Sequence, residues 1–224
     1  PPAGPQAMAA PQPPTHLAPP AAMLPRAPAG FVGRRDELAR LSATVRAAGR
    51  PPLAVVTGPA GVGKTSLAVH WAYAHTGDFP DGILYADLHA GEPDGTGPRP
   101  AGVLHEFLQA LGVPEDRLPK EARAAENLYR SLLAGRRALV LLDNARESAQ
   151  VRPLLPGTDG CTVLVTSRNR LDGLVASDCA RLLELARLTP ADGVRVLRTV
   201  VGDARVAAEP AAAEELAALC DGLP

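Results

Sequence analysis

The 224-residue chain has almost no net charge, since 23 Lys and Arg residues face 24 Asp and Glu residues, for a formal net charge of −1. Affinity for DNA comes largely from basic side chains that neutralise phosphates, so this balance argues against the chain gripping a polyanion by itself. The longest strongly apolar run, Ala138–Leu142, is far shorter than the ~20 residues that a membrane span needs. No N-terminal segment combines a basic start with an apolar stretch, so no signal peptide is predicted and a cytoplasmic protein is expected.

Cysteine and histidine give little sign of a metal or redox site. Cys161, Cys179 and Cys220 are widely scattered and form neither a metal-type pair nor a disulfide framework, which fits a reducing cytosol. We expect each to be a buried small apolar residue. The histidines have spacings that predict no metal site or catalytic base, and they are interpreted as structural or surface residues: His16, His70, His75, His89 and His105.

Proline dominates the first part of the chain. Ten of the 24 prolines fall within residues 1–29, where Arg26 is the only formally charged side chain. Such a stretch cannot offset its ordering entropy by burial, so a disordered, extended linker is predicted there. A ligand for a proline-binding module is the alternative. Because the chain begins at Pro1 without Met, we expect an internal part of a longer protein with a domain upstream of the linker.

From residue 30 onward, short apolar runs alternate with helical patterns. Strands are predicted over residues 53–57, 83–88, 138–142, 162–166 and 182–185. Apolar residues at helical spacing predict helices over 63–75 and around 38–45, 103–111 and 125–132, with a loop rich in Gly and Pro over 91–100. Repeated strands joined by helices indicate an α/β fold over residues 30–188, with a mostly parallel five-stranded sheet flanked by helices.

After residue 188 the pattern becomes helical. Thr189–Asp192 is a typical helix start, and residues 210–215 suit the first turn of a second helix, which Asp221–Gly222 would end. Residues 189–224 are therefore expected to begin a small helical subdomain that this sequence truncates.

The strongest functional signal is the segment Gly58–Thr65, which matches the phosphate-loop pattern G-x-x-x-x-G-K-[ST] in full. Such a loop wraps round a phosphate with its N–H groups pointing inward, and glycines permit the close approach. The following helix presents free N–H groups and the positive end of its dipole to the anion. The expected nucleotide-binding residues here are Gly58, Pro59, Ala60, Gly61, Val62, Gly63, Lys64, Thr65 and Ser66.

Two side chains of this loop have specific expected roles. Lys64 is expected to reach the β- and γ-phosphates, and the Thr65 hydroxyl is expected to ligate Mg²⁺. Only two lysines stand among 21 arginines, and one of them is at the position where a compact ammonium is needed. This coincidence strengthens the prediction of a P-loop NTPase.

The strand over 138–142 is followed by Asp143 and Asn144. A carboxylate at the end of a buried strand beside a phosphate loop can hold Mg²⁺ directly or through water, although an Asp also commonly just ends a strand. Many ATP-hydrolysing relatives place an acid at the position of Asn144 to orient the attacking water. An amide can hydrogen-bond a water but cannot accept its proton, so slow hydrolysis is expected.

Arg168 lies just past the strand over 162–166 and can reach the γ-phosphate and report its presence. Arg170 is a competing candidate, and a solvated arginine is the plain alternative. The expected catalytic residues are thus Lys64, Asp143, Asn144 and Arg168. The sequence has no Asn-Lys-x-Asp guanine reader, so an adenine nucleotide is favoured over GTP.

Taken together, these residues resemble the NB-ARC module of the STAND class of signalling P-loop NTPases, which are related to AAA+ proteins. The motifs occur in that family's order: Phe31-Val32-Gly33-Arg34, the phosphate loop, the strand ending in Asp143, Thr166-Ser167-Arg168 and the terminal Gly222-Leu223-Pro224. Segments 79–88 and 150–156 are more specifically similar to the central domain of AfsR-like SARP transcription regulators of actinobacteria.

The resemblance implies further roles. Val32 and Gly33 would line the adenine, Arg34 would lie near the nucleotide, Pro224 would close over the base, and the sheet would have the strand order of AAA+ relatives. The whole protein would add an N-terminal winged-helix DNA-binding domain, a helical activation domain and helical repeats that sense input. It would activate antibiotic-biosynthesis genes, with a nucleotide-dependent oligomer as a possible state and no membrane partner.

The main hypothesis is a regulatory switch that binds ATP or ADP with Mg²⁺. The identity of the nucleotide would set how the helical subdomain packs on the sheet, and slow hydrolysis would reset the state. Two alternatives stay open: a conventional ATPase that does remodelling work, which Asn144 disfavours, and a P-loop kinase, for which no Arg-rich lid is recognisable.

Overall fold

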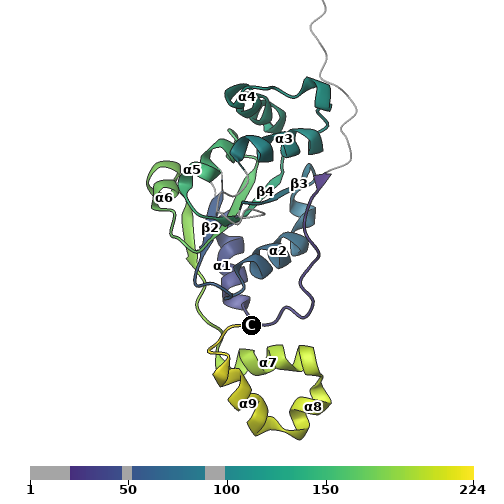
Figure 1. Cartoon of the computed structure of the whole chain (residues 1–224), viewed down its shortest axis with the longest axis vertical. Coiled ribbons are helices and arrows are strands. Elements are labelled where there is room, and N and C mark those ends of the chain that lie inside the picture. The colour runs from purple at the N-terminus through teal and green to yellow at the C-terminus, as the bar shows by residue number, and fades with distance from the viewer. Residues whose placement is uncertain (1–20, 47–51, 89–98) are drawn as a thin grey trace, which may run out of the picture.

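One parallel sheet organises the chain (Figure 1). The computed structural model describes residues 21–46, 52–88 and 99–224, and within these residues six strands form a sheet in the order β1-β3-β4-β5-β2-β6. Every neighbouring pair is parallel. The strands span Ala21–Ala22 (β1), Leu53–Thr57 (β2), Gly82–Asp87 (β3), Leu139–Ala145 (β4), Thr162–Ser167 (β5) and Arg181–Glu184 (β6). The five strands expected from the apolar runs are β2 to β6, and β1 is added at the edge beside β3.

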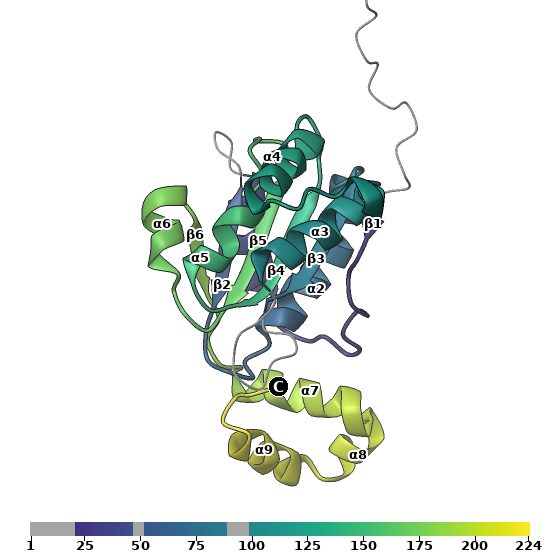
Figure 2. The same ribbon diagram turned by 45° about the horizontal axis from the view of Figure 1, so that its top comes forward.

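Helices cover both faces of this sheet (Figure 2). Helices α1 and α2 pack on one face, and α3 to α6 lie on the other. The bounds are Arg35–Arg46 (α1), Lys64–Ala74 (α2), Pro100–Ala110 (α3), Ala122–Leu133 (α4), Ser148–Val151 (α5), Asp172–Asp178 (α6), Pro190–Val201 (α7), Asp203–Ala208 (α8) and Pro210–Leu219 (α9). Single 3₁₀ turns span Thr76–Asp78, Glu115–Arg117 and Arg152–Leu154. Most of the loop predicted over 91–100 lies outside the described residues.

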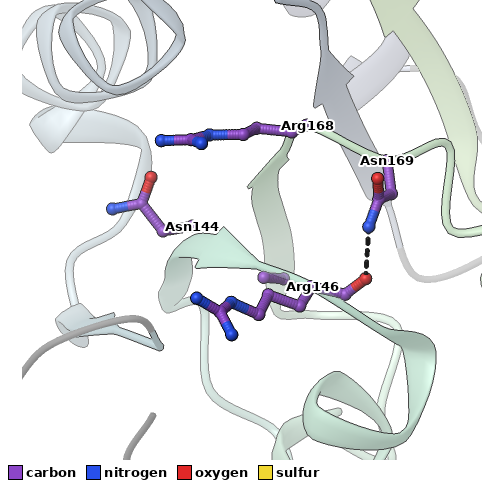
Figure 3. A pocket seen from close by; sticks show the side chains of 5 residues that line it. Asn144, Arg146, Arg168 and Asn169 are labelled. Atoms are coloured by element: carbon purple, nitrogen blue, oxygen red, sulfur yellow. Dashed lines mark hydrogen bonds between the residues drawn. The ribbon is translucent and has the colours of Figure 1, made fainter. Parts of the chain in front are cut away.

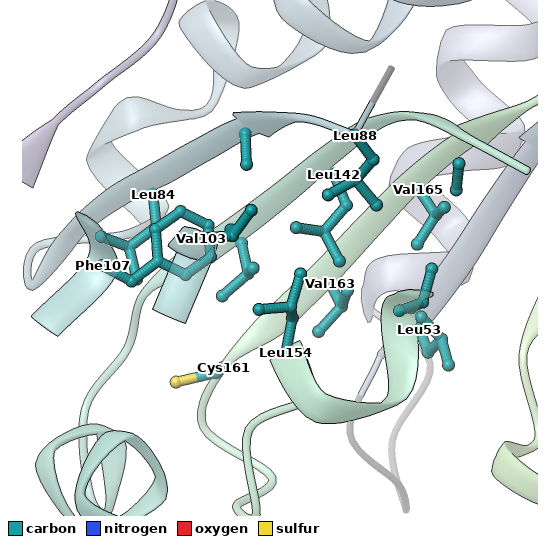
Figure 4. Packing of buried hydrophobic residues seen from close by; sticks show 14 of the residues in the cluster. Leu53, Leu84, Leu88, Val103, Phe107, Leu142, Leu154, Cys161, Val163 and Val165 are labelled. Carbon is teal, nitrogen blue, oxygen red and sulfur yellow. The ribbon is translucent and has the colours of Figure 1, made fainter. Parts of the chain in front are cut away.

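The core under α3 and α4 is built from alternate strand positions (Figure 4). Successive side chains of a strand point to opposite faces, so one set of every second residue faces these helices. That set is Leu84, Ala86, Val140, Leu142, Val163 and Val165. Phe107 of α3 and Tyr129 of α4 stack with ring centroids 6.0 Å apart. The central strands are apolar on both faces because helices bury both.

The opposite core lies between the sheet and helices α1 and α2. Its centre is Trp71 of α2, which is 1% exposed and donates from Nε1 to Oγ of Ser42 on α1 at 2.9 Å. Nε2 of His75 lies 3.3 Å from the same Ser42 oxygen. These contacts fix α2 against α1 and thereby hold the loop that precedes α2.

The edge strand β1 lies within the stretch 1–29 that was expected to be a linker. Ala21 and Ala22 pair with Gly82 and Ile83 of β3. The N–H of Met23 donates to the carbonyl of Ile83 at 3.2 Å. These contacts attach the described end of the proline-rich stretch to the sheet edge. Residues 1–20 lie outside the described residues.

Helices α7, α8 and α9 form a separate layer beyond the carboxyl ends of the parallel strands (Figures 1 and 2). The side chain of Thr189 accepts from the N–H of Asp192 and caps α7, as the sequence pattern predicts. The short helices α5, α6 and α8 were not predicted, because four to seven residues give too little periodicity to recognise.

The expectation of three buried cysteines is wrong for two of them. Cys161 is buried, whereas Cys179 and Cys220 are exposed. Cys179 follows the last residue of α6 and Cys220 follows the last residue of α9, so both occupy helix ends at the surface. Within residues 21–46, 52–88 and 99–224, no helix has the length and apolar character to span a membrane.

Candidate nucleotide-binding site

The loop between β2 and α2 has the backbone shape of a phosphate cradle. Gly58, Gly61 and Gly63 have φ angles of 150°, 75° and 95°, which other residues rarely adopt. A Cβ atom on Gly58 would lie 2.6 Å from the carbonyl oxygen of Leu185. Helix α2 begins at Lys64 and has no acidic residue in its first turn, which contains Thr65 and Ser66, so its positive dipole end is available to an anion.

Lys64 is held inside this loop. Its Nζ donates to the carbonyl oxygens of Gly58 at 3.0 Å and Pro59 at 2.7 Å, and its side chain is buried. Burial lowers the pKa of Lys64, the nearby Arg168 guanidinium lowers it further, and Asp143 opposes the change. The positive charges of Lys64 and Arg168 thus act on the same site, which favours an anion between them.

Asp143 at the end of β4 lies next to the first turn of α2. The Thr65 hydroxyl donates to its Oδ1 at 2.9 Å and its Oδ2 at 3.0 Å. The Thr166 hydroxyl also donates to Oδ1, and the Tyr85 hydroxyl lies 3.4 Å from Oδ2. The sheet register explains the convergence, because β3, β4 and β5 are adjacent and end at the same edge.

The electrostatic balance at Asp143 is unfavourable to its charge. Only 1% of the residue is exposed. This burial is the main effect and raises the pKa of Asp143, whereas hydrogen bonds from Thr166 and Thr65 lower this pKa. The negative charge of Asp87 raises the pKa further, and the hydrogen bond from the Tyr85 hydroxyl lowers it. Burial also raises the pKa of Tyr85, so its hydroxyl stays a hydrogen-bond donor. A buried carboxylate of this kind gains from a cation placed beside it.

These residues fit a magnesium ion brought in with a nucleotide. A hydroxyl and a carboxylate are oxygen ligands of the type that Mg²⁺ prefers, and this ion commonly keeps waters and substrate phosphates as its other ligands. Thr65 and Asp143 would supply the protein side. Among the described residues, no group of three or more His, Cys, Asp or Glu side chains could hold a metal by itself.

A polar pocket of about 220 Å³ adjoins this site at the ends of β4 and β5 (Figure 3). It is lined by Asn144, Ala145, Arg146, Arg168 and Asn169. In Figure 3 the side chains of Arg168 and Asn144 lie near each other and point to the same side. The pocket therefore brings together Asn144 and Arg168, two of the residues that the sequence predicts.

Arg170 is directed elsewhere, because its Nε lies 3.5 Å from Oδ1 of Asp172 and it does not line the polar pocket. Arg146 and Asn169 were not predicted from the sequence. Asn169 donates from Nδ2 to the carbonyl of Arg146 at 2.8 Å, which links the two strand ends.

Asp87 was also missed. It ends β3, and its Oδ1 accepts a hydrogen bond from Nδ2 of Asn144 at 3.0 Å. The same Nδ2 lies 3.2 Å from Oδ2 of Asp143. The signal was available, since Asp87 comes directly after the apolar run Ile83–Ala86, as Asp143 comes after Ala138–Leu142.

The segment before α1 contacts both the phosphate loop and the helical layer. Arg34 has a φ of 62° and donates to the carbonyl oxygen of Val62 at 3.2 Å and to Glu37 at 3.1 Å. A Cβ on Gly33 would lie 2.9 Å from Oδ1 of Asp192 in α7. Val32 precedes this pair and is half-buried. Gly33 and Arg34 thus lie where the phosphate loop meets helix α7, and Val32 directly precedes them.

The end of the chain reaches the phosphate loop from the other side. The position for a Cβ on Gly61 is 3.7 Å from a side-chain carbon of Leu223, and that for Gly63 is 3.5 Å from Cγ of Pro224. The carbonyl of Gly222 accepts from the N–H of Leu188 at 2.8 Å, which anchors this segment to the start of the helical subdomain.

Comparison with known proteins agrees with this geometry. Residues 30–223 match the family described as the AAA ATPase domain. The chain belongs to this family. The AAA ATPase domain is 44% identical over 213 residues to the regulatory protein AfsR of Streptomyces coelicolor and 43% identical over 208 residues to that of Streptomyces griseus. Each match covers 91% of this chain but only 21% and 20% of the relative, so the chain spans about a fifth of their length.

Solved structures share the fold of this AAA ATPase domain. A STAND protein with a tetratricopeptide repeat sensor from Pyrococcus horikoshii superposes with a TM-score of 0.60 and 24% identity, covering 90% of this chain and 29% of that one. Cdc6p from Pyrobaculum aerophilum superposes with a TM-score of 0.53 and 15% identity, covering 83% of this chain and 51% of the other. These neighbours confirm the P-loop NTPase fold, and the AfsR relatives confirm the resemblance to AfsR-like regulators that segments 79–88 and 150–156 indicated.

Proposed function

We propose that this AAA ATPase domain is a regulatory switch that binds ATP or ADP with Mg²⁺. The observation that carries the proposal is that the side chains of Leu223 and Pro224 lie beside Gly61 and Gly63 of the phosphate loop. This proximity gives a bound nucleotide a physical route to the helical subdomain α7–α9. A ligand shifts a conformational equilibrium only if it interacts differently with the two states.

The γ-phosphate would supply that difference. Lys64 and Arg168 are two cations at the same site, and ADP would leave part of their charge without an anion. Pro224, Gly33 and Arg34 would enclose the rest of the nucleotide at the junction with α7. In this scheme the presence of the γ-phosphate sets how the helical subdomain packs on the sheet.

For the whole protein, the similarity to the regulatory protein AfsR supports a further proposal. We propose that a domain upstream of residue 1 binds DNA, that flanking domains sense input, and that the protein activates genes for antibiotic or other secondary-metabolite production in the cytoplasm. Nucleotide-dependent oligomers are part of the same proposal. The near-zero net charge of this chain supports assigning DNA contact to another domain.

Hydrolysis in the proposed switch is slow and resets the ATP state to the ADP state. Support comes from position 144, where an amide stands beside the carboxylate expected to hold Mg²⁺. A conventional ATPase would turn over many ATP molecules per second. A P-loop kinase would release ADP only when a small phosphate acceptor is added.

The proposal is tested by measuring binding and conformation on the 224-residue chain. Calorimetric titration should detect ATP and ADP in the presence of Mg²⁺ and should detect no comparable binding of GTP. Hydrogen exchange should then differ between the ATP-bound and ADP-bound forms within residues 189–224. Identical exchange in both forms, or steady-state turnover of many per second, would contradict the switch and favour the conventional ATPase.

A further inference from the structure

Asn144 connects two carboxylates at the end of the sheet. Its Nδ2 lies 3.0 Å from Oδ1 of Asp87 and 3.2 Å from Oδ2 of Asp143. Asp87 and Asp143 are direct partners in the parallel register of β3 and β4. Neighbouring strands are about 4.8 Å apart, so two like charges are forced together there. The amide of Asn144 is a donor placed between them.

The conformation of Asn144 serves this placement. It has a φ of 56°, in the left-handed region, and the pairing of β4 with β5 is irregular between Leu142 and Ala145. Its N–H donates to the Thr166 hydroxyl at 2.9 Å, which fixes the backbone. Asn tolerates left-handed backbone better than most residues. An Asp at this position would remove the donor and add a third carboxylate.

Hydrogen bonds link Asp87 to the residues expected at the γ-phosphate. Through Asn144 it is linked on one side to Asp143, which is bonded to Thr65 of the phosphate loop. On the other side, Asn144 lines the polar pocket with Arg168, the cation whose charge reaches Lys64 (Figure 3). Asp87 is half-buried, so part of the residue is exposed to solvent.

We propose that Asp87 holds the water that attacks the γ-phosphate, in place of the acid that position 144 lacks. Asn144 is the positioning residue that aims the Asp87 carboxylate. The inference rests on the proposed function, because it concerns the hydrolysis that resets the switch. A carboxylate accepts hydrogen bonds only, so it turns the oxygen lone pair of a bound water away from itself and toward the phosphorus.

The step balances without another reactant. The water oxygen forms a bond to the γ-phosphorus, and the bond from that phosphorus to the oxygen bridging the β-phosphate breaks. The electron pair of the broken bond stays on ADP. Both water protons leave on the inorganic phosphate.

The test combines one isosteric substitution with an exchange of the pair. Asp87→Asn keeps the size of the side chain and removes the carboxylate. The double variant Asp87→Asn/Asn144→Asp keeps one amide and one carboxylate but exchanges their positions. Asp116→Asn, at an exposed site outside the nucleotide site, is the matched control for loss of one negative charge. ATP affinity is measured by calorimetry and single-turnover hydrolysis with excess protein.

We expect Asp87→Asn to bind ATP with wild-type affinity and to hydrolyse it about 10²-fold more slowly. The double variant should hydrolyse ATP at least about tenfold faster than Asp87→Asn, because one of the two positions again carries a carboxylate. A second readout is the affinity for ADP with aluminium fluoride, a mimic of the transition state, which Asp87→Asn should weaken by about tenfold or more while ATP affinity is unchanged.

Three results would overturn the assignment. One is hydrolysis by Asp87→Asn within a few-fold of wild type. Another is a rate loss matched by an equal loss of ATP affinity, which would make Asp87 a purely structural partner of Asn144. The third is a wild-type chain that binds ATP and shows no hydrolysis, which would leave the switch without a role for Asp87. Failure of the wild-type chain to bind any adenine nucleotide would instead remove the proposed function itself.

Discussion

The hydroxyl of Thr65 donates to both carboxylate oxygens of Asp143, at 2.9 and 3.0 Å, although 78 residues separate the two in sequence. The hydroxyl satisfies a carboxylate that burial makes costly to ionise. The same two side chains are the expected protein ligands of Mg²⁺. Binding of the ion would therefore replace an existing hydrogen bond rather than recruit distant groups.

This relationship predicts the effect of removing Asp143. Asp143→Ala should lose most of the dependence of ATP affinity on Mg²⁺, because the expected carboxylate ligand is absent. Calorimetric titrations with ATP, with and without Mg²⁺, measure it. Asp159→Ala, an exposed site in the turn before β5, is the control and should keep the wild-type response. A full Mg²⁺ response in Asp143→Ala would refute the metal role.

Lys64 offers a clean test of phosphate binding, because the chain has only one other lysine. Lys64→Ala should weaken ATP binding by about 10²-fold or more, since a buried cation facing the phosphates is removed. Lys120→Ala removes the same charge from an exposed position and should bind as the wild type does. Equal affinities of the two variants in calorimetry would count against the assignment.

The lowered pKa of Lys64 predicts how ATP affinity depends on pH. Phosphates prefer the protonated ammonium, so affinity should fall as the pH rises through the pKa of Lys64, below the ordinary lysine value of 10.5. Titrations from about pH 8 to about pH 10 would follow this loss. In Lys64→Arg the guanidinium stays protonated, so whatever affinity that variant has should stay flat. A parallel decline in both proteins would place the titration elsewhere.

The phosphate loop should be intolerant of side chains where it passes β6. Gly58→Ala would put a Cβ 2.6 Å from the carbonyl oxygen of Leu185, at a φ of 150°. We expect the free energy of unfolding to fall by about 2 kcal/mol. Gly77→Ala has no neighbouring atom within 4 Å and should change it by less than about 0.5 kcal/mol. Denaturant unfolding of both variants measures the difference, and equal stabilities would contradict this account of the loop.

The sequence was most informative where chemistry and periodicity are local. The phosphate loop is contiguous, and the strand over 53–57 has the residue bounds that were predicted. Leu139, Leu141 and their neighbours are apolar without interruption, which indicates a strand covered on both faces. These elements could be predicted because their signals lie within a dozen residues.

The contacts that complete the site join residues far apart in the sequence and could not be predicted in the same way. The hydrogen bond of Asn144 with Asp87 depends on β3 lying beside β4 in a given register. The approach of Pro224 to Gly63 depends on the path of the helical subdomain. Strand β1 was missed because two alanines between prolines carry no periodic signal, and only the unpaired edge of β3 selects them.

Strand β1 has a practical consequence for work on shortened forms of the protein. The AAA ATPase match begins at residue 30, but a recombinant fragment cut there would leave Gly82 and Ile83 of β3 without their strand partner. Unpaired strand edges invite pairing with another molecule, so such a fragment should aggregate where one that retains Ala21–Pro25 stays dispersed. For β3, the last residues of the proline-rich stretch act as a protective cover.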